Sequence, residues 1–177
     1  MVRKSVDPNI EITLFKKLIH TSVGPIGLFS DGSRIVKVHF EEPGTEVFTE
    51  SENLPECLEI CAQQLQEYFE GKRSVFELPL AAEGTEFQQK VWRQLMKIPF
   101  GKTISYADMA GKLGDPKLIR AAASANGKNP IAIIIPCHRV IGANGDLVGY
   151  AGGLPIKKWL LEHEMKHYSG ISQLSIF

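Results

Sequence analysis

Helix-capping and helix-breaking residues alternate through the second half of this chain, and they constrain its fold more than any other feature. A capping box is present at Thr85-Glu86-Phe87-Gln88, where a threonine and a glutamine three residues later satisfy the first backbone N–H groups of a helix. Apolar residues then recur at helical spacing until Pro99-Phe100-Gly101 ends the helix. The pattern predicts a mainly helical carboxy-terminal part, whose buried face carries Phe87, Val91, Leu95 and Ile98.

Two shorter helices are predicted directly after this one. The first has its cap at Ser105-Tyr106-Ala107-Asp108 and runs through Leu113. The turn Gly114-Asp115-Pro116 follows, and its aspartate can cap a second helix from about Lys117 to Ala125, with proline at the first position. A short helix, a glycine-containing turn and a second helix make a helix-turn-helix candidate. Such a hairpin binds DNA in some proteins and only packs in others, so the pattern leaves both interpretations open.

The second helix of this pair has few long side chains. Its sequence is Arg120-Ala121-Ala122-Ala123-Ser124-Ala125-Asn126. Helices that read bases in the major groove need Arg, Asn or Gln at several positions. A face of small residues instead allows the close approach that minor-groove binding requires. The small residues can also pack against a neighbouring helix, and the two interpretations are compatible if different faces of the helix do each job.

The amino-terminal part shows the pattern of a small antiparallel sheet. Strands are predicted from Ile12 to Ile19, at Leu28-Phe29 and from Ile35 to Phe40. Turns are predicted at Val23–Gly27 and Asp31–Ser33, which is typical of a meander.

One helix accompanies this sheet. Apolar residues at helical spacing run from Leu54 to Phe69 after a polar loop over residues 43–55, and Gly71 ends the helix. The stretch from Val75 to Leu80 is either an edge strand or a connector, because it contains Pro79. We therefore predict an α+β protein, with a scaffold lobe over residues 1–80 packed on a mainly helical domain over residues 85–177.

Composition and charge narrow the class of protein. The chain has 177 residues, of which 44% are hydrophobic and 23% charged, close to the averages for folded domains. No apolar run approaches the roughly 20 residues of a membrane span, and no apolar segment follows the charged amino terminus as in a secretory signal. We expect no membrane association and an intracellular location, cytoplasmic in a prokaryote and nuclear in a eukaryote.

The formal net charge is zero, which by itself does not indicate a nucleic-acid binder. Between residues 112 and 139, however, one acidic residue, Asp115, stands against five basic ones: Lys112, Lys117, Arg120, Lys128 and Arg139. Three cysteines without a secretory signal indicate reduced thiols. Cys57 and Cys61 are four residues apart on the predicted helix, and core packing explains this spacing better than half of a metal site.

The third cysteine, Cys137, lies in the segment with the strongest chemical signal. An apolar run from Ile131 to Ile135 leads into Pro136-Cys137-His138-Arg139. An imidazole and a guanidinium beside a thiol favour the thiolate, whereas burial opposes the charge. A third group is needed to orient His138, and Glu164 in the closing helix is the candidate.

The longer string around this cysteine resembles the active-site signature of a known family. Pro136-Cys137-His138-Arg139-Val140 is similar to that of the methylated-DNA–protein-cysteine methyltransferases, or O6-alkylguanine-DNA alkyltransferases. The resemblance extends in order from about Thr85 to Glu164. It includes Ile104-Ser105-Tyr106, Gly127-Lys128-Asn129-Pro130, Tyr150-Ala151-Gly152-Gly153 and Leu160-Leu161-Glu162-His163-Glu164. At the amino-terminal lobe the resemblance is only to a ribonuclease H-like outline of a small sheet with helices.

The resemblance implies a reaction and a role for each matching residue. Cys137 would accept an alkyl group permanently from O6 of guanine in double-stranded DNA, with O4-alkylthymine as a second candidate substrate, after the base flips out from the minor groove. His138 would act as base through a water molecule, with Glu164 orienting it, and Tyr106 would donate a hydrogen bond to the flipped base. Asn129 would join the recognition helix to the active-site segment, and Arg120 would fill the gap left in the duplex. The recognition helix would face DNA with Lys117, Ala121, Ala122, Ser124 and Ala125, and the base pocket would comprise Val140, Tyr150, Ala151, Gly152 and Gly153.

This interpretation requires no metal and no cofactor, and it describes a single-turnover enzyme that acts as a monomer. Two alternatives remain open. The first is a non-catalytic protein that binds alkylated bases, although such relatives lack the acceptor cysteine. The second is a thiol hydrolase that uses Cys137, His138 and Glu164 as a triad, for which turnover is the discriminating feature.

Overall fold

In the computed structural model, residues 14–41 and 49–174 are described, with side chains described as far as residue 168. Three strands form an antiparallel meander in the order β1 (Phe15–Thr21), β2 (Gly24–Ser30) and β3 (Ile35–Phe40). The sheet was predicted, and its hairpin register runs from Thr21 opposite Gly24 to Phe15 opposite Ser30. The predicted strand residues 12–13 and residues 43–48 of the predicted loop over residues 43–55 lie outside the described residues.

The turn predicted over Val23–Gly27 is wrong, because β2 already begins at Gly24. Gly24 has a φ of 108°, a conformation that suits glycine and lets the chain reverse within two residues after Thr21. Pro25 lacks a backbone N–H, but its carbonyl accepts a hydrogen bond from the N–H of Glu41 at 3.0 Å. Buried Ile26 and Leu28 follow it, so the strand has an apolar face despite its proline.

Helix α1 (Glu56–Phe69) packs on this sheet and buries Leu58, Cys61 and Leu65 completely. Gly71, with a φ of 72°, ends it as predicted. The following stretch to Leu80 is a connector rather than a strand. Its backbone pairs with the sheet at the bridge between Ile35 and Leu80, where the Ile35 N–H donates to the Pro79 carbonyl at 2.8 Å.

The helical half begins with α2 (Glu86–Leu95) and α3 (Tyr106–Leu113), and both have the capping boxes that the sequence predicts. The two-residue strands β4 (Ile104–Ser105) and β5 (Val140–Ile141) pair in parallel beside them. Gly114 ends α3 in the left-handed conformation, and the Asp115 side chain accepts from the Lys117 N–H at 2.9 Å. The second helix of the hairpin starts as the 3₁₀ turn η1 (Pro116–Leu118) and continues as α4 (Ile119–Gly127), so it begins less regularly than predicted.

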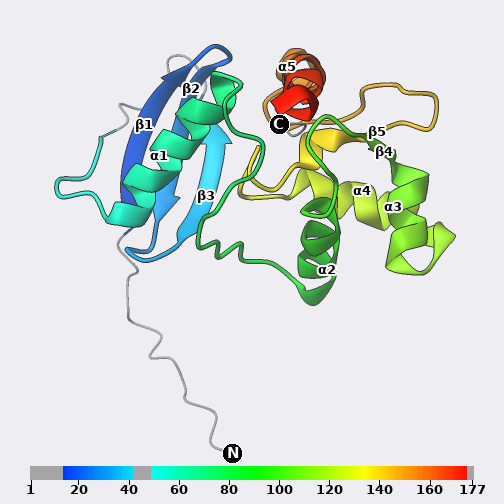
Figure 1. The fold of residues 1–177 in the computed structure, drawn as a ribbon. Coiled ribbons are helices and arrows are strands. Elements are labelled where there is room, and N and C mark those ends of the chain that lie inside the picture. The colour runs from blue at the N-terminus through cyan, green and yellow to red at the C-terminus, as the bar shows by residue number, and fades with distance from the viewer. Residues whose placement is uncertain (1–13, 42–48, 175–177) are drawn as a thin grey trace, which may run out of the picture.

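The closing helix α5 (Leu154–Leu174) connects the two halves. Figure 1 shows the sheet and α1 on one side, α2, α3 and α4 on the other, and α5 between them. Trp159 of α5 packs on Phe69 of α1, with ring centroids 5.6 Å apart. One cluster of buried side chains spans both halves, and the predicted boundary between residues 80 and 85 stays a prediction. Within the described ranges, no helix is both long enough and apolar enough to cross a membrane.

Candidate active site

The segment before Cys137 follows an irregular path that is buried from Ile131 to Val140. Ile133 has a φ of 69°, in the left-handed region that a β-branched residue rarely occupies. The Ile134 N–H donates to the Ala132 carbonyl at 2.8 Å, and the Cys137 N–H donates to the Ile135 carbonyl at 2.8 Å. Each of these bonds closes a three-residue γ-turn. The apolar run of the sequence is therefore a tightly folded loop, with backbone strain of the kind that is concentrated at functional sites.

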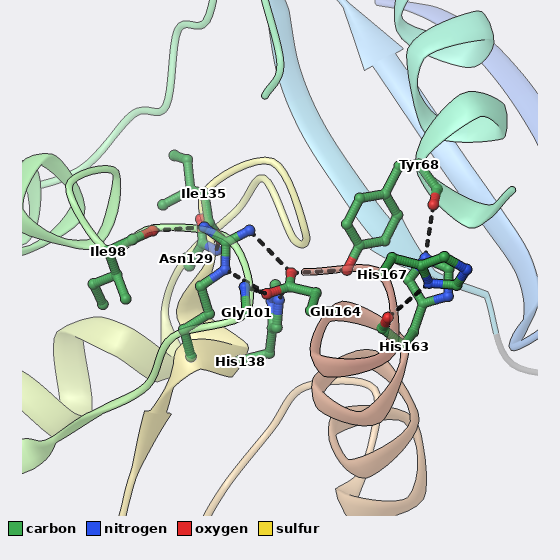
Figure 2. Close-up of polar contacts among 10 residues, drawn as sticks. Tyr68, Ile98, Gly101, Asn129, Ile135, His138, His163, Glu164 and His167 are labelled. Carbon is green, nitrogen blue, oxygen red and sulfur yellow. Dashed lines mark hydrogen bonds and ion pairs between the residues drawn. The ribbon is translucent and has the colours of Figure 1, made fainter. Parts of the chain in front are cut away.

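Asn129 holds this loop in place. Its Nδ2 donates to the Ile135 carbonyl at 2.8 Å and lies 3.1 Å from Cys137 Sγ, while its Oδ1 accepts from the Ile131 N–H at 3.0 Å. Figure 2 shows the amide of Asn129 beside Ile135. A single side chain just after α4 thus binds both ends of the loop and its thiol, a geometry that fits the linking role expected for Asn129.

Cys137 begins the 3₁₀ turn η2 (Cys137–Arg139) and is 6% exposed. Burial raises the pKa of its thiol, whereas the hydrogen bond from Asn129 and the charge of Lys157 lower it by less. The thiol therefore holds its proton more firmly than an exposed cysteine does. A nucleophile in this state needs a base nearby.

His138 and Glu164 form a buried pair, as the sequence predicts for the orienting group. His138 Nε2 lies 2.7 Å from Glu164 Oε1, and both side chains are at most 1% exposed. Burial alone would raise the pKa of Glu164, but hydrogen bonds from His138 and Arg139 and the positive charge of Arg139 lower it well below its usual range. The carboxylate is thus ionised and can only accept, so Nε2 carries the hydrogen. Burial lowers the pKa of His138, which makes the ring neutral and leaves Nδ1 as its basic atom.

Nδ1 of His138 is one of three buried polar atoms that have no hydrogen-bond partner among the described residues. The other two are the hydroxyl of Tyr150 and Oδ1 of Asn126. The rings of Tyr150 and His138 are 6.5 Å apart, and Asn126 Nδ2 donates to the Cys137 carbonyl at 3.3 Å. Because unpaired buried polar groups are rare in native proteins, their occurrence around one thiol marks a place where a ligand or water completes the bonding.

Glu164 has further donors that sequence reasoning missed. Arg139 donates to both carboxylate oxygens at 2.9 Å and to the Ile98 carbonyl at 2.6 Å. The Gly101 N–H donates to Oε2 at 3.0 Å, and the Tyr68 hydroxyl donates to Oε1 at 2.9 Å (Figure 2). Arg139 is 6% exposed and its charge is paired with that of Glu164, so it does not add to the basic surface expected from the sequence.

A cavity of about 480 Å³ lies between the helix-turn-helix and the loop before α5. Arg120 and Tyr106 line it from the helix-turn-helix, and Tyr150 and Ala151 line it from the loop before α5. Asn126 Nδ2 donates to the Tyr106 hydroxyl at 3.2 Å, so the phenol proton remains available to donate. The cavity therefore includes two residues expected in the base pocket, Tyr150 and Ala151, together with Tyr106, expected to bond to the flipped base, and Arg120, expected to contact the duplex.

The other residues expected in the base pocket, Val140, Gly152 and Gly153, are not among those that line this cavity. Gly152 lies against Phe40 of β3, where an added Cβ would come within 2.5 Å of the ring. Gly153 has a φ of 86° and donates its N–H to the Tyr150 carbonyl at 3.0 Å. The Val140 carbonyl accepts from buried Lys157 at 2.7 Å, and the same ammonium donates to the Val148 carbonyl at 2.8 Å. Lys157 thus holds the two ends of the segment from Val140 to Val148 together. Its place in an ordinary helical pattern does not reveal this role.

Helix α4 has two distinct faces. Ala122 and Ala125 are buried, and the Ala125 carbonyl accepts from Trp92 Nε1 of α2 at 2.9 Å. The side chains of these two alanines therefore pack inside, which corrects their placement on the outer surface. The exposed face of α4 carries Arg120, Ala121 and Ser124, and Lys117 is exposed in the 3₁₀ turn η1 before it.

Fold and site together define a class of protein in which a helix-turn-helix stands beside a buried thiol with its own base. Comparison with known sequences places the chain more closely. Residues 14–82 match the ribonuclease-like domain of 6-O-methylguanine DNA methyltransferase, and residues 86–166 match the DNA binding domain of the same family. The chain belongs to this family.

Individual relatives agree with this assignment. The chain is 43% identical to the methylated-DNA–protein-cysteine methyltransferase of Methanosarcina acetivorans over 85% of the chain and 98% of that protein. It is 51% identical to the constitutive enzyme of that name from Bacillus subtilis, over 68% of the chain and 73% of the relative. The crystal structure of Mycobacterium tuberculosis O6-methylguanine methyltransferase superposes with a TM-score of 0.78 at 40% identity, covering 88% of this chain and 94% of that one. The same mycobacterial protein has also been solved in complex with DNA, again with a TM-score of 0.78 to this chain at 40% identity, over 86% of this chain and 94% of that one.

Proposed function

We propose that this protein repairs DNA by transferring an alkyl group from O6 of guanine in a duplex to Sγ of Cys137, once per molecule. The observation that carries the proposal is the buried thiol between Asn129 and the His138–Glu164 pair, beside a cavity that reaches the helix-turn-helix. O4-alkylthymine is a second candidate substrate, and the protein acts as a monomer.

The reaction is a displacement at the alkyl carbon. The C–O6 bond breaks as the Sγ–C bond forms, and the thiol proton moves to Nδ1 of His138, through a bridging water if the two atoms do not meet. The resulting imidazolium is stabilised by Glu164, whose carboxylate is already ionised. The electron pair of the broken bond stays on the guanine, to which the Tyr106 hydroxyl donates a hydrogen bond as it leaves. The guanine then takes up a proton from water, and the imidazolium of His138 returns its proton to water. A thioether is stable, so the thiol is not regenerated.

DNA has to deliver the base into the cavity, because the thiol is 6% exposed and cannot reach a stacked guanine. The exposed face of α4 is small enough to lie close to the minor groove, and Arg120 stands at the cavity beside it. Arg120 fills the space that the flipped nucleotide leaves in the duplex. Main-chain groups of Cys137, Val140 and Ala151 contact the guanine edge.

The test is the intact mass of the protein after incubation with a duplex that contains one O6-methylguanine, followed by peptide mapping. We expect one added methyl group on Cys137 and no turnover. Cys137→Ser should take up nothing while still binding the duplex, and Cys57→Ser, which alters a thiol in α1, should behave as the unaltered protein does.

Each rival function has its own outcome in this experiment. A protein that binds the lesion but stays unmodified would be a damage-binding protein. One that releases methanol or another product with multiple turnovers would be a thiol hydrolase. Transfer that persists in Cys137→Ser would refute the proposed acceptor.

A further inference from the structure

Tyr68 is a residue of the amino-terminal lobe that reaches the active site. It belongs to α1, is completely buried, and donates its hydroxyl hydrogen to Glu164 Oε1 at 2.9 Å. The two residues are 96 positions apart in the sequence. The hydroxyl is the donor, because the carboxylate can only accept, and burial keeps the pKa of Tyr68 well above its ordinary value.

Both polar ends of Tyr68 are held by α5. Figure 2 shows its hydroxyl at Glu164 and its backbone carbonyl at His163, whose Nε2 lies 2.7 Å from that oxygen. Phe76 packs against the ring with centroids 5.6 Å apart, and Phe100 packs edge-on at 6.1 Å. The ring therefore has little freedom to move, and its hydroxyl is aimed at one carboxylate oxygen.

That oxygen is the one to which His138 is bonded. Glu164 Oε1 lies 2.7 Å from His138 Nε2 and accepts from Tyr68 and from Arg139 Nη2, each at 2.9 Å. Donors on one oxygen share its electron density, so each weakens the attraction of the oxygen for the others. A hydroxyl from the amino-terminal lobe thus competes with the base of the reaction for the same acceptor.

We propose that Tyr68 is a positioning residue for alkyl transfer, which acts through Glu164 to set the basicity of His138. The inference rests on the proposed function and gives the amino-terminal lobe a part in the chemistry beyond that of a scaffold. Without the hydroxyl, the negative charge of Glu164 is stabilised by one hydrogen bond fewer. The carboxylate therefore binds the N–H of His138 more strongly. The imidazolium is then favoured over the imidazole, and His138 has to lose its proton before it can accept one from the thiol.

Other charged and titratable groups also face this pair, and they are unchanged by an alteration at Tyr68. From η2 and the loop before α5 they are Cys137, Arg139 and Tyr150, and from α5 they are Lys157 and His163. The effect of the hydroxyl is therefore isolated by Tyr68→Phe, which keeps the ring and its packing.

The experiment measures the rate of Cys137 alkylation against pH, between about pH 5 and pH 9, in the full chain. Two alkyl donors are used, the O6-methylguanine duplex and iodoacetamide, and peptide mapping reads modification at Cys137 alone. In Tyr68→Phe we expect the acid limb of both profiles to shift to higher pH by on the order of half a unit. Near the foot of that limb the rate should fall roughly threefold.

Two control variants separate this effect from a general loosening of the interface. Phe76→Leu removes packing against the same ring but keeps the hydroxyl, so it should lower stability and leave the acid limb in place. Glu164→Gln removes the acceptor charge through which Tyr68 acts, so adding Tyr68→Phe to it should shift nothing further. Site-specific fluorotyrosine at position 68 strengthens the donor and should shift the limb to lower pH.

The positioning role would be overturned if a folded Tyr68→Phe protein kept the acid limb of its pH profile in place. An equal shift of that limb in Phe76→Leu would overturn it as well. If Tyr68→Phe does not fold, the fluorotyrosine protein decides, since its packing is preserved. Failure of the proposed function looks different, because the unaltered protein would then take no methyl group from the duplex. The iodoacetamide profiles would still decide the role of Tyr68 in that case.

Discussion

Replacing Glu164 with glutamine removes the charge of a buried carboxylate and leaves its shape almost unchanged. Arg139, whose side chain alone is 7% exposed, then keeps a buried charge without its counter-ion, and the amide NH₂ of the glutamine faces donors where an acceptor stood. Removing one partner of a buried ion pair costs about 3–5 kcal/mol. A domain of this size is stable by about 5–15 kcal/mol. We therefore expect Glu164→Gln to lower the melting temperature by roughly 6–20 °C.

The free energy of unfolding is measured by urea denaturation of both proteins at neutral pH, and the melting temperature by calorimetry. Glu162→Gln is the matched control, because it lies two positions earlier on α5 with its side chain 66% exposed, 3.8 Å from Lys158. Loss of an exposed pair of this kind should change stability by less than about 1 kcal/mol. A Glu164→Gln protein as stable as the control variant would refute the inference that this buried pair contributes to folding.

The pH dependence gives an independent check. The pKa of Glu164 is lower in the folded protein than the value near 4.3 of an unfolded glutamate. Its stabilising effect is therefore complete above about pH 4.3 and is lost as the pH falls toward the folded pKa. The difference in stability between the unaltered protein and Glu164→Gln should accordingly shrink on acidification. A difference that grows in acid would contradict the assigned ionisation state.

Two further predictions concern DNA contact and the pocket wall. Arg120→Ala should slow alkyl transfer from a duplex at least about tenfold, as expected for loss of a group worth about 1.4 kcal/mol or more, and leave the reaction with free O6-benzylguanine unchanged. Equal loss in the two rate measurements would contradict a role for Arg120 in the duplex. Gly152→Ala should destabilise the protein by about 1–3 kcal/mol, because its Cβ would meet the Phe40 ring at 2.5 Å. Gly111→Ala, where a Cβ meets nothing within 4 Å, serves as the control in the same urea titrations.

Local signals made the helical half predictable. Thr85 and Ser105 each form a capping box with a residue three positions later, and Asp115 caps the next turn, so the sequence contains both partners of each contact. The meander could be predicted for the same reason, except at Gly24-Pro25, where a turn-like pair of residues begins a strand. There the apolar residues after Pro25 are buried in the core, and the free energy gained by this burial outweighs the preference of Gly24-Pro25 for a turn.

The candidate site was predictable only in part, because its remaining contacts join distant positions. The family resemblance named Cys137, His138 and Glu164 before any contact was known. Tyr68 stands in the sequence as one more apolar position of a helix, and its contact with Glu164 spans 96 residues. Arg139 stands there as a surface charge, and its pairing depends on where α5 lies. No periodicity or spacing encodes such contacts, since they follow from packing of the two halves.

The alanine-rich outer face of α4 has a consequence for how damage is found. A surface that carries Ala121 and Ser124 offers few groups that distinguish one base pair from another, so every step along the duplex costs nearly the same free energy. A flat energy profile of this kind allows one-dimensional diffusion over long tracts without pauses at preferred sequences. Discrimination is then left to kinetics, since a weakened pair opens more often than a sound one while the protein passes. Under the proposed function each molecule is used once, so it gains most from such a search, in which its thiol reacts only where a base has already left the helix.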